Sequence, residues 1–227
     1  SESFRGYYAK SNIVRNSDIK TPVILIVGVG METGKFCIQL SLKNEMLKLG
    51  LNSQCITYNP LGYIFNMNVL KYDPNIPFPD MVFFINQYIK QLELNDVNNS
   101  QCFIINVGGG ISGINKLHHN HFGVTYKAYL NATTIDFMVI CINTITNINR
   151  LKYEIDTLKL LGFKNIALVI SKYTYESTSL GIVDGPFVYL ADYEDVENTL
   201  NRCKQILTDI PIFLQEEAEN SELFKYI

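Results

Sequence analysis

Several features that would assign this chain of 227 residues to a particular partner or to a membrane are missing from its sequence. Lys and Arg number 19 and Asp and Glu number 22, so the net charge is only −3, and no strong positive field is present to hold a nucleic acid backbone. No apolar run approaches the roughly 20 residues that a membrane-spanning helix requires. We therefore expect a soluble protein with neither a nucleic acid nor a membrane as its partner.

Paired cysteines and a secretory leader are missing as well. The five cysteines stand at positions 37, 55, 102, 141 and 203 without any C-x-x-C pair. This pattern favours reduced core residues over a disulfide framework or a zinc site, and it predicts a reducing, cytoplasmic compartment. The sequence also lacks an initiator Met and a basic leader with an apolar core. We interpret residues 1–3 as the remnant of a tag and expect the chain to be cut from something longer.

The composition is that of a globular protein, with 47% hydrophobic and 18% charged residues. The length suits one domain, which we place at residues 21–227, after a polar linker or arm at residues 1–20. Prolines at positions 60, 74, 77 and 79, together with many aromatic residues, mark an insert at about residues 60–80. We interpret this insert as a satellite core beneath a long loop, with a partner-docking surface or a lid as the alternatives.

Apolar runs of β-branched residues alternate along the chain with segments of helical spacing. The pattern predicts strands over residues 23–27, 54–58, 102–105, 136–142, 166–170 and 188–190. It predicts helices over residues 35–49, 81–94, 120–131, 147–161, 194–207 and 215–222. This order is typical of the α/β class with a doubly wound, mainly parallel sheet in a three-layer sandwich. In such sheets ligands bind at the carboxyl ends of the strands.

A glycine-bearing loop joins the first predicted strand to the first predicted helix. Successive backbone N–H groups in such a loop can point at phosphate oxygens, while the helix N-terminus and a lysine supply positive charge. In the phosphate-binding pattern G-x-x-x-x-G-K-[ST] the final hydroxyl holds Mg²⁺, but here a phenylalanine stands at that position. The candidate phosphate-binding residues of this loop are Gly28, Gly30, Thr33, Gly34, Lys35 and Phe36.

Two other interpretations of this loop stay open. It is compatible with a dinucleotide-binding loop, but such a site needs an acidic residue at the end of the second strand, and the segment Thr57-Tyr58-Asn59 has none. It is also compatible with a plain strand-to-helix turn in which the glycines serve geometry and the lysine is solvated. We favour the phosphate-binding loop over both.

Two further segments resemble a known family. Residues 103–110, FIINVGGG, resemble the strand and V-E-G-A-G-G loop of dethiobiotin synthetases and cobyrinate amidase-type P-loop proteins. Residues 137–171 resemble the strand, turn, helix and next strand of the same proteins. The resemblance spans roughly residues 22–172 and implies a P-loop NTPase-like fold. It adds Asn106, Gly108, Gly109 and Gly110 to the phosphate site, and it implies that Ser171 and Lys172 contact a base, at a place where Asn is usual.

This chain departs from the family pattern at the metal site. There, the Thr after the loop lysine and the Glu of V-E-G serve Mg²⁺, whereas Phe36 and Asn106 hold those positions here. Phosphoryl transfer depends on positioning and on charge neutralisation by the metal, so efficient NTPase activity and a Mg²⁺ cofactor are both doubtful. ATP or another phosphate-bearing ligand can still bind through backbone amides and Lys35. The nucleotide, and whether it is hydrolysed, stay open.

A second resemblance is to a clostridial family found beside radical-SAM enzymes in ribosomal peptide maturation systems. Its loop pattern V-G-x-G-x-x-x-x-K-F-x-x-Q-L matches residues 27–40, and later matches fall at residues 109–111 and 122–126. The resemblance implies that Phe36 is a family feature and that another domain precedes this one. It also implies peptide-maturation enzymes or a precursor peptide as partners. A homodimer is a further option that we consider, but no reaction follows.

Other reactive residues carry weaker hypotheses. His118, His119 and His121 could bind a metal, although a solvated loop is the simpler interpretation because no Cys or carboxylate stands beside them. Ser112, Ser171 and Cys141 lack a placed acid or base partner, so the catalytic residues stay unassigned. Our first hypothesis is therefore a phosphate-binding or partner module. An active ATP-dependent synthetase, which would need Glu32, Asp73 or Asp80 as replacement metal ligands, and a structural domain without a ligand are the alternatives.

Overall fold

The computed structural model describes residues 16–30, 33–71, 75–112, 123–175 and 187–227. Its main sheet contains β1 (Val23–Gly28), β2 (Ser53–Thr57), β3 (Asn68–Val69), β4 (Cys102–Asn106), β5 (Phe137–Ile142), β6 (Ile166–Ile170) and β9 (Ile212–Leu214). These seven strands lie in the order β3-β2-β4-β1-β5-β6-β9, and every neighbouring pair is parallel. A separate antiparallel pair joins β7 (Tyr173–Tyr175) to β8 (Val188–Leu190).

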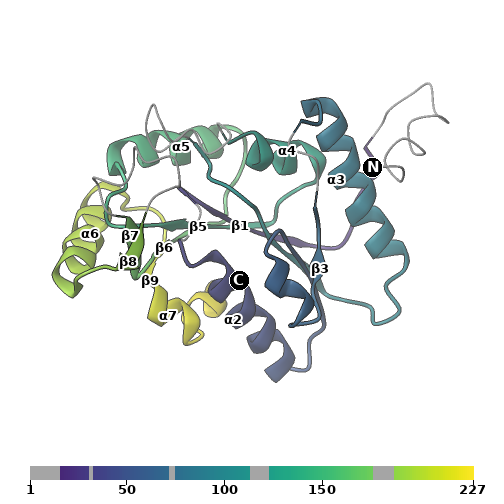
Figure 1. Cartoon of the computed structure of the whole chain (residues 1–227), viewed down its shortest axis with the longest axis horizontal. Coiled ribbons are helices and arrows are strands. Elements are labelled where there is room, and N and C mark those ends of the chain that lie inside the picture. The colour runs from purple at the N-terminus through teal and green to yellow at the C-terminus, as the bar shows by residue number, and fades with distance from the viewer. Residues whose placement is uncertain (1–15, 31–32, 72–74, 113–122, 176–186) are drawn as a thin grey trace.

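Helices cover both faces of this sheet, as Figure 1 shows. One face carries α3 (Phe78–Leu94), α4 (Val124–Ala132), α5 (Ile148–Leu160) and α6 (Tyr193–Ile206). The other face carries α2 (Lys35–Lys48) and α7 (Gln215–Glu219), followed by the 3₁₀ helix η4 (Leu223–Tyr226). The predicted α/β fold, with a doubly wound parallel sheet in three layers, is therefore confirmed. None of the described helices combines the length and apolar character needed to cross a membrane.

The strand β1 is buried on both of its faces, as its unbroken apolar run predicts. Val23, Leu25 and Val27 pack in a cluster with the helices α3 to α6. Ile24 and Ile26 alternate with them and pack in a second cluster on the α2 side. Full burial of each such side chain contributes about 1.5–3 kcal/mol. The first loop is therefore anchored on one of the best-buried strands of the molecule.

Some predicted boundaries were wrong, for local reasons. The helix α3 begins at Phe78 and not at residue 81, because Pro77 is its N-cap and Pro79 lies in the first turn, where a missing N–H costs little. The helix α4 begins at Val124, after Gly123 in the left-handed conformation at φ +70°, and the first residues predicted for it, 120–122, lie outside the described part. The strand β8 matches the strand predicted over residues 188–190, whereas the equally short strands β3, β7 and β9 were not predicted.

The insert contains more regular structure than a loop. The 3₁₀ helix η1 (Pro60–Tyr63) is followed by β3, which extends the sheet beside β2. Met67 and Leu70 are buried, whereas Tyr63 is 64% and Ile64 is 76% exposed. The insert therefore includes a small core and also presents apolar side chains to solvent. Its role as a lid or a docking surface stays a prediction.

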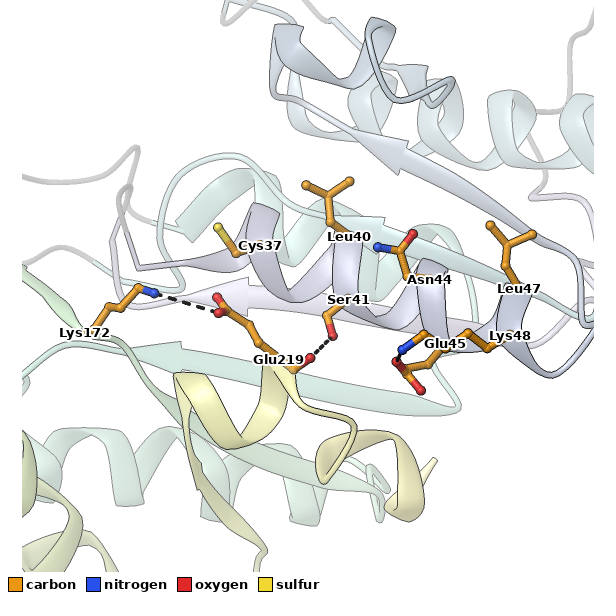
Figure 2. Close-up of a pocket in the computed structure, with 9 residues that line it drawn as sticks. All are labelled: Cys37, Leu40, Ser41, Asn44, Glu45, Leu47, Lys48, Lys172 and Glu219. Atoms are coloured by element: carbon orange, nitrogen blue, oxygen red, sulfur yellow. Dashed lines mark hydrogen bonds and ion pairs between the residues drawn. The ribbon is translucent and has the colours of Figure 1, made fainter.

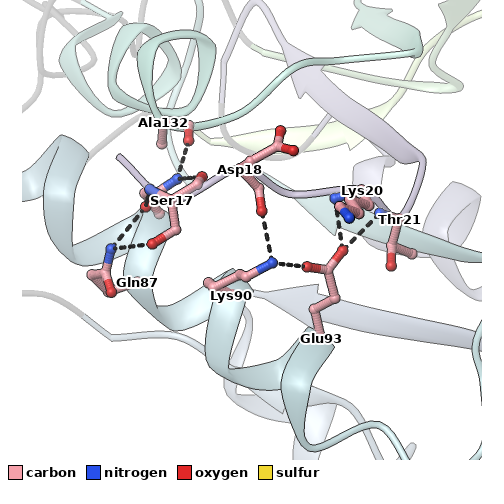
Figure 3. A network of polar contacts seen from close by, with 9 residues as sticks. Ser17, Asp18, Lys20, Thr21, Gln87, Lys90, Glu93 and Ala132 are labelled. Atoms are coloured by element: carbon pink, nitrogen blue, oxygen red, sulfur yellow. Dashed lines mark hydrogen bonds and ion pairs between the residues drawn. The ribbon is translucent and has the colours of Figure 1, made fainter. Parts of the chain in front are cut away.

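The described part of the N-terminal arm is held against α3, and Figure 3 shows the network. Asn86 accepts a hydrogen bond from the Ser17 N–H (2.7 Å), and its amide donates to the carbonyls of Ser17 (2.9 Å) and Ala132 (2.8 Å). Glu93 Oε1 accepts from the N–H groups of Lys20 (2.8 Å) and Thr21 (2.7 Å). These contacts fix the chain just before it enters β1. The earlier residues of the predicted arm lie outside the described part.

Candidate functional site

The two glycine loops meet at the carboxyl edge of the sheet. The strand β1 lies between β4 and β5, which is where the strand order reverses and where doubly wound sheets bind ligands. The Ile111 N–H donates to the Gly28 carbonyl (2.8 Å), which joins the second loop to the first. The Val29 N–H donates to the Cys141 carbonyl (3.0 Å), which joins the first loop to β5. The topology thus brings together two loops that lie far apart in the sequence.

Gly34 ends the first loop and is the N-cap of α2, with φ +73°. This left-handed conformation is strained for residues with a Cβ. A Cβ at this position would also lie 2.6 Å from Gln215 Oε1. A Cβ at Gly28 would lie 2.3 Å from Thr33 Oγ1, so both glycines are required by close packing. Between them, residues 31 and 32 lie outside the described part.

Lys35 is the first residue of α2 and is only 8% exposed. Its ammonium donates to the carbonyl oxygens of Gly30 (2.6 Å) and Gly109 (2.9 Å). The side chain therefore bridges the first loop and the second. Its positive charge is held at the place where a bound anion would meet both loops.

A cavity of about 460 Å³, which we call the loop cavity, opens beside this lysine. Both glycine loops and the ends of β2 and β6 contribute to its wall, which includes Thr33, Gly34, Lys35, Phe36, Asn106, Gly108 and Gly109. Within the described residues, no side chain caps the N-terminus of α2, which faces this wall. Such a terminus carries about half a positive charge and presents backbone N–H groups, so it favours an anion.

Asn106 contributes an unpaired polar group to the loop cavity. It is the last residue of β4 and pairs in register with Ile26 and Thr57. The period of two in a strand places it on the same face as Ile104, toward α2. Asn106 is 6% exposed, and its amide makes no hydrogen bond to any described residue. Because buried polar groups are normally paired, this amide points to a ligand or to water in the cavity.

The second loop is shaped by the same kind of close packing as the first. A Cβ at Gly108 would lie 2.8 Å from the ring of Tyr58, which borders the loop cavity at the end of β2. Gly109 has φ +78° and supplies the carbonyl that Lys35 binds.

Gly28, Gly30 and Gly110 do not line the cavity but support its loops. The three predicted histidines lie outside the described residues.

The two residues predicted to contact a base lie apart from the loop cavity. Ser171 is fully buried, and its hydroxyl donates to Gln215 Oε1 (3.2 Å). Lys172 lines a second hollow of about 740 Å³ along α2, which we call the α2 groove. Figure 2 shows Lys172 facing Glu219 there, and its ammonium lies 3.8 Å from Glu219 Oε2. Cys37 lines both hollows. The base-contacting role of Ser171 and Lys172 therefore stays a prediction.

Two residues near the site were missed by sequence reasoning. Gln215 is 1% exposed, accepts a hydrogen bond from the Lys172 N–H (3.2 Å), and backs directly onto Gly34. The sequence predicts it as the first residue of a helix over residues 215–222, and no pattern marks its burial. Tyr173 borders the loop cavity just after β6. The rule that ligands bind at strand ends could have found this tyrosine.

Acidic residues are missing from the described wall of the loop cavity. Asp80 lies in the first turn of α3 and is not part of this wall. Glu32 and Asp73, the other candidate metal ligands, lie outside the described residues. Across the described part of the chain, no three His, Cys, Asp or Glu side chains are grouped so that they could hold a metal ion.

The candidate nucleophiles Cys141 and Ser171 are both fully buried. Burial raises the pKa of the Cys141 thiol to about 12, although the Lys35 charge opposes this shift. A thiol of that pKa is protonated at neutral pH and is a weak nucleophile. Neither residue lines the loop cavity.

Comparisons with known proteins are informative at the level of the fold. No family model matches the chain, and no curated protein matches its sequence. A DUF1611 family protein from Anabaena variabilis is 12% identical at a TM-score of 0.52, over 90% of this chain and 58% of that chain. An ATP complex of a McdA variant from Cyanothece is 12% identical at a TM-score of 0.48, over 91% and 88%. Chloroplast FtsY from Physcomitrella patens is 12% identical at a TM-score of 0.39, over 87% and 71%. At this identity the likeness to the DUF1611 family protein shows the fold alone, an α/β domain built on a parallel sheet.

Proposed function

We propose that the loop cavity binds the phosphate groups of a nucleotide such as ATP, or of another phosphate-bearing ligand, and that the domain is a binding module. One observation carries this proposal. The ammonium of Lys35 is held between the two glycine loops, beside the N-terminus of α2 and the amide of Asn106, and no described side chain caps that terminus or pairs with that amide. Positive charge and donors are what phosphate oxygens require.

Binding would offer the Lys35 ammonium charged acceptors in place of two neutral carbonyl oxygens. In the free protein the Lys35 ammonium donates to two carbonyl oxygens. Phosphate oxygens are stronger acceptors, since hydrogen bonds between ionised groups are about twice as strong as neutral ones. Asn106 Nδ2 would donate to the same phosphate. The cavity volume of about 460 Å³ lies within the usual range for small-molecule sites.

The described residues fit Mg²⁺ poorly. Phe36 offers no oxygen at the first turn of α2, and Asn106 offers a neutral carbonyl where a carboxylate would serve. Mg²⁺ is usually held by one or two carboxylates together with substrate phosphates. We therefore expect ligand binding that hardly depends on Mg²⁺.

Calorimetry with ATP, GTP and inorganic phosphate, each with and without Mg²⁺, tests this function. We expect binding in the absence of Mg²⁺ and at least about a tenfold loss of affinity in Lys35→Met, because a charged hydrogen-bond donor is removed. The matched control is Lys48→Met, at the exposed C-terminal end of the same helix. Equal affinity of Lys35→Met and the native protein would contradict the proposal. Rapid Mg²⁺-dependent turnover would favour the ATP-dependent synthetase instead.

We further propose that this module acts in ribosomal peptide maturation, with the maturation enzymes or the precursor peptide as its partner. The support is the matched loop pattern, whose Gln39 and Phe36 both have structural roles. Gln39 is fully buried, and its amide donates to the carbonyls of Ile56 (2.9 Å) and Ile104 (2.8 Å). The ring of Phe36 packs edge-on against Phe65 of the insert, at 5.8 Å between centroids.

A reconstituted reaction tests this role. The rate of peptide modification by a radical-SAM enzyme from such a system would be measured with and without this protein, in the presence and absence of ATP. We expect the protein to increase the rate and Lys35→Met to lose the ATP-dependent part of that increase. An identical rate with and without the protein would contradict the role in peptide maturation and leave phosphate binding untouched.

A further inference from the structure

A second, smaller cavity lies on the other side of the glycine loops. It has a volume of about 150 Å³ and lies at the end of β5 and along the first turns of α5, and we call it the α5 cavity. Val29 of the first loop and Ile111 of the second contribute to its wall. The same two loops therefore border both cavities, although the wall residues differ.

Asn143 gives the α5 cavity an unpaired hydrogen-bond donor. The residue directly follows β5 and is 2% exposed. Its Oδ1 accepts from the Thr146 hydroxyl (2.9 Å), and its own N–H donates to that hydroxyl oxygen (3.2 Å). Its Nδ2 has no acceptor among the described residues. Since Asn143 lines the cavity, this donor is available to an acceptor oxygen of a ligand.

Charges of both signs line the same cavity in a definite order. Arg150 and Glu154 both contribute to the wall, one helical turn apart on α5. Arg150 lies in the turn that Asn147 caps, where the helix dipole is positive, and Glu154 lies one turn further along. A ligand carboxylate is therefore favoured at the Asn143 end, and a ligand ammonium is favoured beside Glu154.

The rest of the wall and the volume limit the size of the ligand. Val29, Ile111 and Leu151 supply apolar surface between the polar ends. The volume of about 150 Å³ is well below the roughly 300–1,000 Å³ of sites for drug-sized ligands, so it favours a small ligand such as an amino acid with a small or medium apolar side chain.

We propose that the α5 cavity binds a free α-amino acid with an apolar side chain. Its carboxylate accepts from Asn143 Nδ2 and from Arg150, its ammonium donates to Glu154, and its side chain packs against Ile111 and Leu151. The proposal does not rest on phosphate binding, because the cavity and its donors are separate from Lys35 and Asn106. It adds a second small-molecule site to the one proposed above.

The test is a calorimetric titration of the whole chain with L-alanine, L-valine and L-leucine. N-acetyl-L-leucine, which lacks the ammonium, and L-leucine methyl ester, which lacks the carboxylate, are the matched ligand controls. We expect at least one free amino acid to bind and each blocked form of it to bind at least about tenfold more weakly, since each loses a charged contact.

Two conservative variants locate the ligand in this cavity. Asn143→Asp keeps the acceptor for Thr146 but replaces the Nδ2 donor by a carboxylate oxygen, so it should abolish binding of an amino acid. Glu154→Gln should weaken binding at least about tenfold, whereas Asp156→Asn, on the same helix but outside the cavity wall, should leave it unchanged. A thermal melt of each variant checks folding. Failure of all three amino acids to bind, or undiminished binding in both cavity variants, would overturn the proposal.

Discussion

At the scale of single residues, Gly34 shows how the first glycine loop is held in place by packing against Gln215. Its backbone has φ +73°, and Gln215 occupies the space where a side chain would begin. Gln215 is itself held by the Ser171 hydroxyl (3.2 Å) and by Glu219, whose Oε1 accepts from its Nε2 (2.6 Å). The end of β6 and the start of α7 therefore set the position of the residue that precedes Lys35.

Replacement of Gly34 by alanine should destabilise the fold more than the same change at Gly50. Both glycines have a φ near +70°, but a Cβ at Gly50 would meet nothing within 4 Å. We expect a loss of about 1 kcal/mol in the free energy of unfolding for Gly50→Ala, from backbone strain alone. Gly34→Ala should lose a further 1–3 kcal/mol or so, because Gln215 must move. Urea denaturation measures both, and equal losses would contradict the close packing described.

A double variant identifies the neighbour that causes this difference. Gln215→Ala removes the side chain that a Cβ at position 34 would meet. The additional loss caused by Gly34→Ala should therefore shrink when it is measured in the Gln215→Ala background. If the double-mutant cycle gives no coupling free energy between positions 34 and 215, another contact is responsible for the difference.

Asn106 provides the sharpest residue-scale test of the metal hypothesis. Asn106→Asp places a carboxylate on the wall of the loop cavity, of the kind that Mg²⁺ prefers. We expect this variant to bind ATP more weakly than the native protein without Mg²⁺, because like charges repel, and to recover affinity when Mg²⁺ is added. Calorimetry at two Mg²⁺ concentrations measures this. A native protein that already requires Mg²⁺, with no gain in the variant, would contradict our interpretation of the site.

Sequence patterns predicted the loops better than the residues behind them. Gly34 and Lys35 could be found because they stand in a glycine loop after a recognisable strand, and Asn106 because its strand and loop resemble those of a known family. Gln215 could not, because its role depends on a contact with a residue 181 positions earlier in the chain, at the opposite end of the sequence. Local periodicity carries no information on such contacts.

At the scale of secondary-structure elements, α3 organises the entry of the chain into the sheet. The Lys90 ammonium donates to the Asp18 carbonyl (2.7 Å) and to Glu93 Oε2 (2.6 Å), as Figure 3 shows. Glu93 also accepts hydrogen bonds from the backbone N–H groups of Lys20 and Thr21. Burial alone would raise the pKa of this carboxyl, but these hydrogen bonds prevail and lower the pKa to about 2.

This shift predicts how the stability of the arm depends on pH. The ordinary pKa of Glu93 is 4.5 and its folded value is about 2, so the charged form is favoured by folding. Its stabilisation is complete above pH 4.5 and is lost as the pH falls toward 2. Glu93→Gln should therefore lower the free energy of unfolding by about 2 kcal/mol at pH 7, after an allowance for solvent screening.

Urea denaturation between pH 7 and pH 2.5 or so measures this difference. The gap between the native protein and Glu93→Gln should narrow steadily below pH 4.5. Glu222→Gln is the matched control, because it removes an exposed carboxylate that pairs only across one turn with Lys225. A gap that stays constant over the whole range would show that the Glu93 charge does not hold the arm.

The long elements were predictable, but among the short strands β8 was predicted and β3, β7 and β9 were not. Fully buried strands such as β1 and β6 can be predicted from the sequence because their residues form unbroken apolar runs. The two-residue β3 and the three-residue β9 form because their backbone groups pair with the neighbouring strands β2 and β6. This pairing is a tertiary effect that the local sequence does not show. The start of α3 was misplaced because prolines were taken as a sign of loop, although the first turn of a helix accepts them.

At the scale of the whole molecule, the parallel sheet explains why two weak sequence signals make one site. The strands β1, β4 and β5 are neighbours, so the segments that follow them meet at one edge. That edge carries two deeply buried asparagines, Asn106 in the loop cavity and Asn143 in the α5 cavity. Among the described residues, the side-chain amide of Asn106 has no hydrogen-bond partner, and Asn143 Nδ2 has no acceptor. Such an arrangement suits a domain that holds two ligands on either side of the glycine loops.

The most direct measurement is a crystal structure of this protein soaked with a non-hydrolysable ATP analogue. We predict that the terminal phosphates occupy the loop cavity, that the Lys35 ammonium moves from the Gly30 and Gly109 carbonyls to phosphate oxygens, and that Asn106 Nδ2 donates to the same group. A structure in which the lysine keeps both carbonyl bonds while the analogue binds elsewhere, or does not bind at saturating concentration, would contradict the account.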